Sequence, residues 1–573
     1  DKPGRTRSHG SRLARRMGVF LGVSLLAGGG YAAWHEMHTS KLQALWLNRY
    51  AENLDYQIEP GASSSIQFPD AGPFDRRLGY AALPTFLERL TQRGFTVQQQ
   101  VSFSPALLRY VQRGFFVPYP EKSKAGLTID DCRGEPLYAN SYPHQYYASF
   151  DDVPPVIAMS LLFIEDRGLL DAGRPSANPA VDWPRFTMAA VSQVEKKLGL
   201  PVQAAGGSTL ATQVEKYRHS PEGRTGDAEE KIRQMISASV RTYREGQQTM
   251  VTRQRIVRDY LNSVPLSAAY GHGEVHGIAD GLRLWYGADF AEVNRVLDAR
   301  RNEGVSYETQ GLALRQVLSL LIAQRRPSYY LGAGRADMAE LTDSHIRLLA
   351  NGGVIGTRLR NAALQQQVEF RNLRLEPGIR EVPSSKGITA ARMRLSNLLG
   401  VSLYELDRLD LAATTPLHGE LQGQISNYLH RLADPAFAGE VGLFGERMLS
   451  PERTGDVRYS FTLFERGEQG FRVRVQTDNT NQPFDINEGS KLELGSTAKL
   501  RVLTTYLEVI AELHERYAKS DVATLRKAEA VDPLTRWALA YLIQHDDRNL
   551  PAMLDAALER RYSASPTERF FTG

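Results

Sequence analysis

The hydrophobic pattern predicts an apolar segment, a linker and a small mixed module in the first part of the chain. Residues 17–34 form an apolar run without a charge. Residues 51–73 are rich in Ser, Gly, Pro and acidic residues, which is typical of a linker. Helical spacing over Tyr80–Arg93 and alternation over Phe95–Val101 predict a helix and a strand. We therefore expect a small α+β module within residues 51–125.

The rest of the chain is predicted to be mostly helical, with two pairs of strands. Apolar residues at three- and four-residue spacing predict a helix at Leu312–Arg325. The last strands lead into a Gly-Ser-Thr turn and a helix at Lys499, which indicates a separate α/β unit. The other predicted segments are a strand pair within Gly126–Tyr138, helices over Val153–Gly287, a helical region over residues 336–440, and strands at Val457–Phe464 and Phe471–Thr477.

The apolar segment is long enough to cross a membrane, since its 18 residues reach about 27 Å as a helix. The alternative is a cleaved signal peptide, for which Tyr31-Ala32-Ala33 offers a cleavage site. The length favours a retained anchor over residues 17–36 that follows a basic tail, residues 1–16. Excess positive charge places that tail in the cytoplasm and the bulk of the chain across the membrane. The basic residues are Lys2, Arg5, Arg7, Arg12, Arg15 and Arg16.

Composition excludes several classes of protein. The chain has 573 residues, enough for several domains, and a net charge of only +4. Its Lys and Arg residues are spread along the sequence, so we expect no nucleic acid partner. Cys132 is the single cysteine, which excludes an intramolecular disulfide and cysteine-rich metal sites.

Two polar segments are candidates for an active site. The apolar run Ser160–Ile164 ends in Glu165-Asp166-Arg167, which places a carboxylate against an apolar wall, as suits a general base. A salt bridge at a helix end would give the same pattern. The second segment has two glycines that let a ligand approach the backbone, hydroxyls that can cap a helix, and cations suited to a diphosphate. It lacks the spacing of a P-loop. Its residues are Gly206, Gly207, Ser208, Thr209, Gln213, Lys216 and Arg224.

Together these segments resemble the glycosyltransferase domain of class A penicillin-binding proteins and monofunctional peptidoglycan glycosyltransferases. The family's Glu-Asp-x-x-Phe motif corresponds to Glu165–Leu169, and its Gly-Gly-Ser-Thr-x-Thr-Gln-Gln-x-x-Lys motif to Gly206–Lys216. The similarity spans Gly126–Tyr330 and suggests a domain over residues 126–335. Further matches are Tyr260-Leu261-Asn262-Ser263-Val264, Gly271-His272-Gly273, Gly277-Ile278, Trp285-Tyr286-Gly287 and the segment Arg325–Tyr330.

The resemblance implies a mostly α, lysozyme-like domain that polymerises lipid II at a bacterial inner membrane, facing the periplasm. Glu165 takes the role of the base that activates the sugar 4-hydroxyl, and polyprenyl diphosphate leaves. Lys216, Arg224 and Lys231 would neutralise that diphosphate. The implied substrate-binding residues are Asp166, Arg167, Gly207, Ser208, Thr209, Gln213, Lys216, Arg224 and Lys231. The implied partners are lipid II, the nascent glycan strand, the membrane and other cell-wall synthesis proteins.

This chain departs from the family at one important position. The family's second catalytic glutamate falls at Gln234, with Glu229 and Glu230 as less well aligned substitutes. Mg2+ commonly assists the family, but an amide cannot hold a metal by charge or protonate a leaving group, so both metal use and full activity stay open. Other departures are Leu169, Ala172, Ala211 and Thr212.

A third pattern predicts the start of an α/β penicillin-binding transpeptidase-like domain over residues 441–573, after the helical region 336–440. Leu494–Lys499 resembles the family's Gly-Ser-Thr-x-Lys motif, which makes Ser496 a candidate nucleophile and Lys499 its activator. A Lys-Thr-Gly motif is absent from the sequence, so transpeptidase activity stays open. The main alternative to a polymerase is a membrane-anchored pseudoenzyme that binds lipid II or glycan and organises other cell-wall proteins.

Overall fold

The computed structural model describes residue 20 and residues 27–183, 208–375, 386–468, 470–482, 486–491, 493 and 495–560. The chain divides into two compact units, Asp1–Asn487 and Glu488–Gly573. Nine of the twenty residues of the predicted anchor, 17–19 and 21–26, lie outside the described residues. Among the helices that are described, none has both the length and the apolar character needed to span a bilayer.

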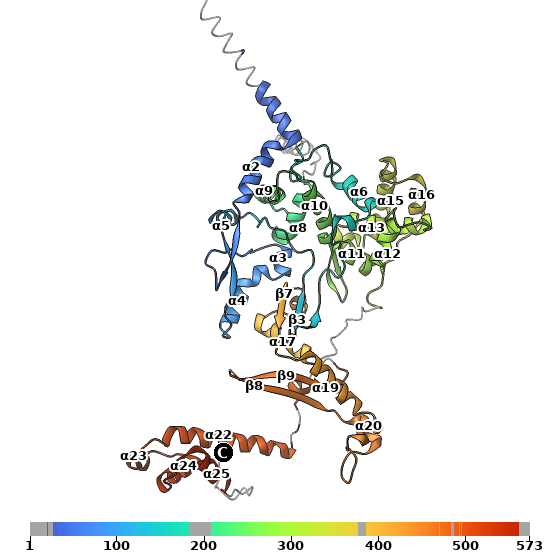
Figure 1. Cartoon of the computed structure of the whole chain (residues 1–573). Helices are drawn as coiled ribbons and strands as arrows, with labels where there is room; N and C mark the ends of the chain where they lie inside the picture. The colour runs from blue at the N-terminus through green and yellow to red at the C-terminus, as the bar shows by residue number, and fades with distance from the viewer. Residues whose placement is uncertain are drawn as a thin grey trace, which may run out of the picture. The chain divides into compact units, whose positions relative to one another are not determined.

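Helix α13 (Tyr307–Ala323) lies at the heart of the largest hydrophobic core of the first unit (Figure 1). It confirms the helix predicted at Leu312–Arg325 and begins earlier, because the Ser306 side chain accepts a hydrogen bond from the Thr309 amide. A Cβ atom at Gly311 would lie 2.7 Å from the Ala363 nitrogen, so glycine permits close helix packing here. The helices that contact α13 are α6 (Pro155–Glu165), α11 (Gly277–Gly281), α12 (Phe290–Leu297), α15 (Arg335–Asn351) and α16 (Thr357–Gln365). Helix α14 (Pro327–Tyr330) follows α13 along the chain and contacts α15.

Three helices beside this core carry most of the candidate site. They are α8 (Leu210–His219), α9 (Ala228–Tyr243) and α10 (Met250–Ser263). The prediction of helix throughout Val153–Gly287 is wrong at residues 166–182, which form turns and irregular chain, and again where β5 (Pro265–Ala269) and β6 (Gly273–His276) form an antiparallel hairpin. Gly277 allows the chain to pass from β6 directly into α11, because its φ is +79° and an added Cβ would lie 2.6 Å from the Asn262 carbonyl oxygen.

The predicted α+β module packs directly on these helices. Its strand β2 (Gln99–Phe103) lies slightly beyond the predicted Phe95–Val101 and pairs antiparallel with β1 (Tyr56–Pro60). The linker prediction for residues 51–73 is therefore wrong at β1, whose five residues are all exposed and acquire strand structure through β2. The module's helices are α2 (Lys41–Glu52), α3 (Pro73–Arg77), α4 (Leu83–Thr91) and α5 (Pro105–Gln112), of which α2 packs on α9 and α3 on α8.

A three-stranded sheet joins distant parts of the first unit, with strand order β4-β3-β7. Strands β3 (Leu127–Asp130) and β4 (Pro136–Ala139) form the predicted antiparallel pair. Strand β7 (Leu411–Thr414) returns from the far end of the unit and lies parallel to β3, beside it in Figure 1. Helices α17 (Lys386–Leu399) and α18 (Leu403–Leu406) precede β7, and their apolar side chains share a core with β3 and α4.

The two units divide the predicted transpeptidase-like domain. Strands β8 (Ser460–Gly467) and β9 (Gly470–Asp478) belong to the first unit, where the Gln422 side chain of α19 donates to the backbone oxygen of Gln476 at 2.6 Å. The described part of the second unit is helical, so the α/β character expected there is not found in those residues. The remaining helices are α19 (Gly419–Arg431), α20 (Pro435–Glu440), α21 (Ile486–Gly489), α22 (Ala498–Tyr517), α23 (Val522–Lys527), α24 (Pro533–Gln544) and α25 (Leu550–Leu558).

Candidate active site

Glu165 is the last residue of α6, and its side chain is only 16% exposed. Proline at the first position of α6 suits a helix start, and the apolar residues Ile157 and Leu161 anchor the helix in the core. The helix stops at Asp166, whose φ of −159° is extended. The predicted placement of a carboxylate at the end of an apolar helix is therefore confirmed.

Groups from two other elements hold the Glu165 carboxylate. The Gln213 side-chain amide on α8 donates to Oε2 at 3.2 Å. The Gln324 amide, at the C-terminus of α13, makes a longer bond of 3.5 Å to Oε1. The Arg325 guanidinium lies 3.9 Å from Oε1. The carboxylate thus lies where α6 and α13 end beside α8. Gln213 holds one of its oxygens and Gln324 the other.

Helix α8 presents different chemistry on its two faces. Thr209 caps its start, since the threonine hydroxyl accepts from the Thr212 amide while the Thr212 hydroxyl accepts from the Thr209 amide. Gln213, Lys216 and Tyr217, at spacings of three and four residues, share the face toward Glu165. The cap fixes where the helix begins, and therefore which side chains face the carboxylate.

Two lysines lie near one another on this side of α8. Burial lowers the pKa of Lys216, while the charge of Glu165 raises it. Burial and the charge of Lys216 lower the pKa of Lys231 to about 8. Lys231 Nζ donates to the Ser208 hydroxyl at 2.8 Å, which joins α9 to the start of α8. Arg224, predicted to accompany these lysines, instead has an 82% exposed side chain 4.0 Å from Glu222.

Gln234, at the position of the family's second glutamate, is buried within α9. Its amide donates to the Ser220 hydroxyl at 2.9 Å and to the Thr225 hydroxyl at 3.0 Å. The nearby Glu230 accepts from Ser220 and from Arg233. Among the residues that the structure describes, no three His, Cys, Asp or Glu side chains gather as a metal site. The neutral amide and the arginine-bound carboxylate are poor ligands for Mg2+, which prefers charged oxygen ligands.

The other predicted residues divide into three groups. Asp166 is buried, and Arg167 donates to the Phe163 carbonyl at 3.1 Å and stacks on the Phe163 ring. Gly207 lies outside the described residues. Ser496 and Lys499 lie in the second unit at the start of α22, where both are exposed.

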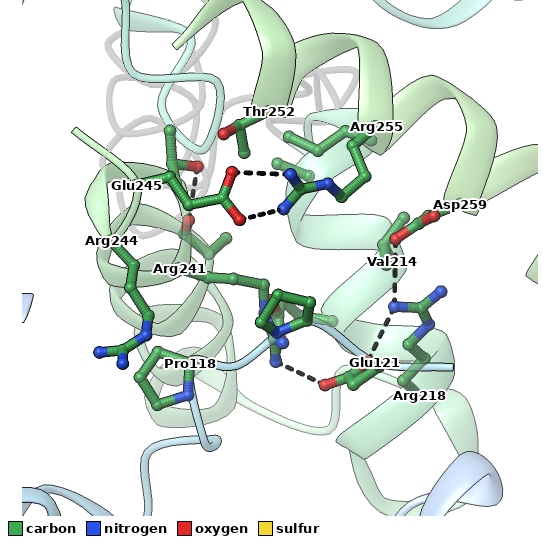
Figure 2. Close-up of a pocket in the computed structure, with 16 residues that line it drawn as sticks. Pro118, Glu121, Val214, Arg218, Arg241, Arg244, Glu245, Thr252, Arg255 and Asp259 are labelled. Atoms are coloured by element: carbon green, nitrogen blue, oxygen red, sulfur yellow. Dashed lines mark hydrogen bonds and ion pairs between the residues drawn. The ribbon is translucent and has the colours of Figure 1, made fainter. Parts of the chain in front are cut away.

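A cluster of buried ions, not predicted from sequence, lies on the opposite face of α8 (Figure 2). We call Asp75, Glu121, Glu215, Arg218, His219 and Arg241 the ionic junction. In Figure 2, Glu121 extends from the module segment after Pro118 and lies between two arginines, Arg218 at 2.8 Å and Arg241 at 2.7 Å. His219 contacts Glu121 and Asp75, each at 2.8 Å.

Glu121, Glu215, Arg218 and Arg241 of the ionic junction line a small cavity, and neither Glu165 nor Lys216 is part of its lining. The charges of the ionic junction are paired with one another. We therefore infer that the junction attaches the module to α8. Burial lowers the pKa of His219, but the charges of Glu121 and Asp75 outweigh this effect and raise that pKa to about 10. Burial raises the pKa of Asp75, although the contact with His219 lowers it. The surrounding cations hold the pKa of Glu121 well below its usual value, although burial raises it.

A family model covers the residues of the candidate site. Residues 133–348 match the family model described as Transglycosylase, and this range includes Glu165, α8, α9 and α13. A comparison with curated proteins gives no similar sequence. Over residues 133–348 this chain therefore carries a transglycosylase domain, the glycosyltransferase domain of class A penicillin-binding proteins.

Proposed function

We propose that this protein polymerises lipid II into glycan strands with release of polyprenyl diphosphate, and that Glu165 is the general base. The observation that supports this most is the mostly buried Glu165 carboxylate, held by Gln213 and Gln324 within a transglycosylase domain. A base must be fixed within hydrogen-bond reach of the hydroxyl that it deprotonates. Two amide donors on separate oxygens provide that fixed orientation.

In the proposed reaction, Glu165 takes the proton of the sugar 4-hydroxyl of one lipid II molecule. The hydroxyl oxygen forms a bond to the anomeric carbon of the growing chain. The bond from that carbon to the diphosphate oxygen breaks, and the diphosphate leaves with the electron pair. Lys216 and Lys231, which lie near one another beside α8, are suited to stabilise the departing negative charge. The exposed Arg224 is less well placed for this role.

The substrate is a lipid, so we further propose that residues 17–36 anchor the chain in a bacterial inner membrane. The basic residues before this segment favour a cytoplasmic N-terminus, which leaves the catalytic domain in the periplasm. Lipid II and the nascent glycan strand are then the partners at the membrane surface, with other cell-wall synthesis proteins alongside. We do not assign a transpeptidase reaction to Ser496 and Lys499, which stay predictions.

We expect polymerisation to proceed without added Mg2+, because the residues around Gln234 do not suit this ion. Gln234 and Glu230 are already engaged by Ser220, Thr225 and Arg233. No step of the proposed reaction needs a metal.

A pseudoenzyme that binds lipid II is the second candidate, and Gln234 is the observation that favours it. The neutral amide of Gln234, which is hydrogen-bonded to Ser220 and Thr225 before α9, cannot exchange a proton with the reacting groups. In that case the domain would hold lipid II without consuming it.

The test is polymerisation of labelled lipid II by the full chain in detergent, with and without Mg2+. We expect glycan strands from the parent, and a rate about a hundred- to ten-thousandfold lower from Glu165→Gln, because the amide cannot accept the proton. Lipid II binding by this variant should be unchanged. An equally active Glu165→Gln would refute the assigned base. An inactive parent that gains activity in Gln234→Glu would establish the pseudoenzyme instead.

A further inference from the structure

The two amides that hold Glu165 are themselves held by one hydroxyl. The Tyr217 hydroxyl lies 2.8 Å from Oε1 of Gln324 and 3.1 Å from Oε1 of Gln213. Its single proton serves one carbonyl at a time, and Gln324 is the nearer acceptor. The Tyr217 hydroxyl, the two amides and the Glu165 carboxylate thus form a closed polar group that spans α6, α8 and the end of α13.

The orientation of these amides matters because a side-chain amide has two chemically opposite ends. An amide nitrogen donates to a carboxylate, whereas an amide oxygen would repel it. A hydroxyl that donates to an amide oxygen favours the orientation in which the nitrogen of that amide faces Glu165, and the Tyr217 hydroxyl is within reach of Gln324 and of Gln213. Burial and the charge of Glu165 raise the pKa of Tyr217, so its hydroxyl keeps the proton that this role needs.

Tyr217 is also held firmly in place. Its ring packs against the hydrophobic core of the domain, with the Tyr260 ring centroid 6.2 Å away. Lys216 Nζ lies 4.4 Å from the ring centroid on the site side of α8. A hydroxyl on a packed aromatic ring is a more rigid reference point than the flexible side chains of the two glutamines.

We propose that Tyr217 is a positioning residue, which acts through Gln213 and Gln324 to hold the Glu165 carboxylate in the orientation that accepts the substrate proton. This rests on the proposed function. Small displacements of a catalytic group from its reactive geometry cause large losses of rate. Loss of the hydroxyl should therefore lower kcat and leave substrate binding unchanged.

The experiment compares Tyr217→Phe with the parent, as full chain in detergent with labelled lipid II. Phenylalanine keeps the ring and removes only the hydroxyl. We expect kcat to fall about tenfold, with KM for lipid II within about twofold of the parent. The matched control is Tyr147→Phe, which removes a hydroxyl from another core tyrosine, 2.8 Å from Asn294 Oδ1 and remote from Glu165 in the hydrogen-bond network. Its kcat should equal that of the parent.

A second variant separates positioning from a general loss of structure. Because Gln324 is the nearer acceptor of the Tyr217 proton, Gln324→Ala should lower kcat by a similar factor, and the double variant should lose little more. If melting shows Tyr217→Phe to be unfolded, Gln324→Ala, which leaves the core ring intact, tests whether the amide nearer to the Tyr217 hydroxyl orients Glu165.

Three results would overturn the role of Tyr217 while the proposed function stands: an unchanged kcat in Tyr217→Phe, a raised KM with kcat unchanged, or losses that multiply in the double variant. A parent that makes no polymer would overturn both.

Discussion

Replacement of Glu121 by alanine removes a carboxylate that three buried cations share. In the parent, the ionic junction contains three carboxylates and three cations, with His219 protonated. Without Glu121, one net positive charge remains among the same buried side chains. The exposed fractions of the partner side chains are 4% for Arg218, 8% for His219 and 19% for Arg241.

The expected cost follows from this burial. Removal of one partner of a buried ion pair costs about 3–5 kcal/mol. We expect the lower end of this range, because each cation keeps a second carboxylate: Asp259 for Arg218, Asp75 for His219 and Glu215 for Arg241. Glu121 lies on the module and its cations on α8 and α9, so the loss should appear where the module meets these helices. We expect the local free energy of opening there to fall by about this amount.

Hydrogen exchange measured by mass spectrometry tests this on the full chain. Peptides that cover residues 105–125 and 210–219 should exchange about a hundredfold faster or more in Glu121→Ala, since about 1.4 kcal/mol corresponds to a factor of ten. The matched control is Glu88→Ala, an exposed carboxylate on α4 of the same module, which should change the free energy by less than about 0.5 kcal/mol. Exchange in Glu121→Ala as slow as in the parent would refute the assigned role of the ionic junction.

Two further predictions concern pH. His219 has an ordinary pKa of 6.5 and a folded-state pKa of about 10, so its contribution to stability should be complete below about pH 6.5 and lost as pH rises through about 10. Thermal melting of the parent and of His219→Gln across this pH range measures the difference. An equal dependence of melting temperature on pH in the two proteins would contradict this prediction. Lys231, with a pKa of about 8, should lose its charge as pH rises through that value, so kcat/KM should fall there. Lys231→Arg, which stays charged, should extend activity to higher pH, whereas an unchanged alkaline limb would exclude Lys231 as its source.

The part of the site that could be predicted from sequence is the part with a local pattern. Glu165 ends an apolar run, so the sequence alone predicts it at the end of a helix. Gln213 and Lys216 follow a helix cap, so their spacing predicts them on one face of the next helix. Tyr217 was missed because a tyrosine in a helix is usually a core residue. Its position four residues after Gln213 is the one signal that could have assigned it to the same face.

Other features depend on partners far away in the chain. Glu121 lies in an ordinary polar segment. Its role in the ionic junction depends on cations about a hundred residues later in the chain, which its local sequence does not reveal. Strand β1 alternates apolar and polar residues over a short, fully exposed stretch, and it pairs with β2 further along the chain. Arg224 was placed with the lysines by motif order, but the turn after α8 directs it into solvent.

The parallel pairing of β3 with β7 also bears on how the protein is made and handled. Strand β3 leaves the ribosome long before β7, so its second edge stays open until residues 411–414 have been synthesised. An unpaired strand edge readily pairs with another chain. A shortened chain that ended at residue 348, where the family match stops, would keep that edge permanently open and be prone to aggregate. Truncated versions for structural work should therefore extend beyond β7.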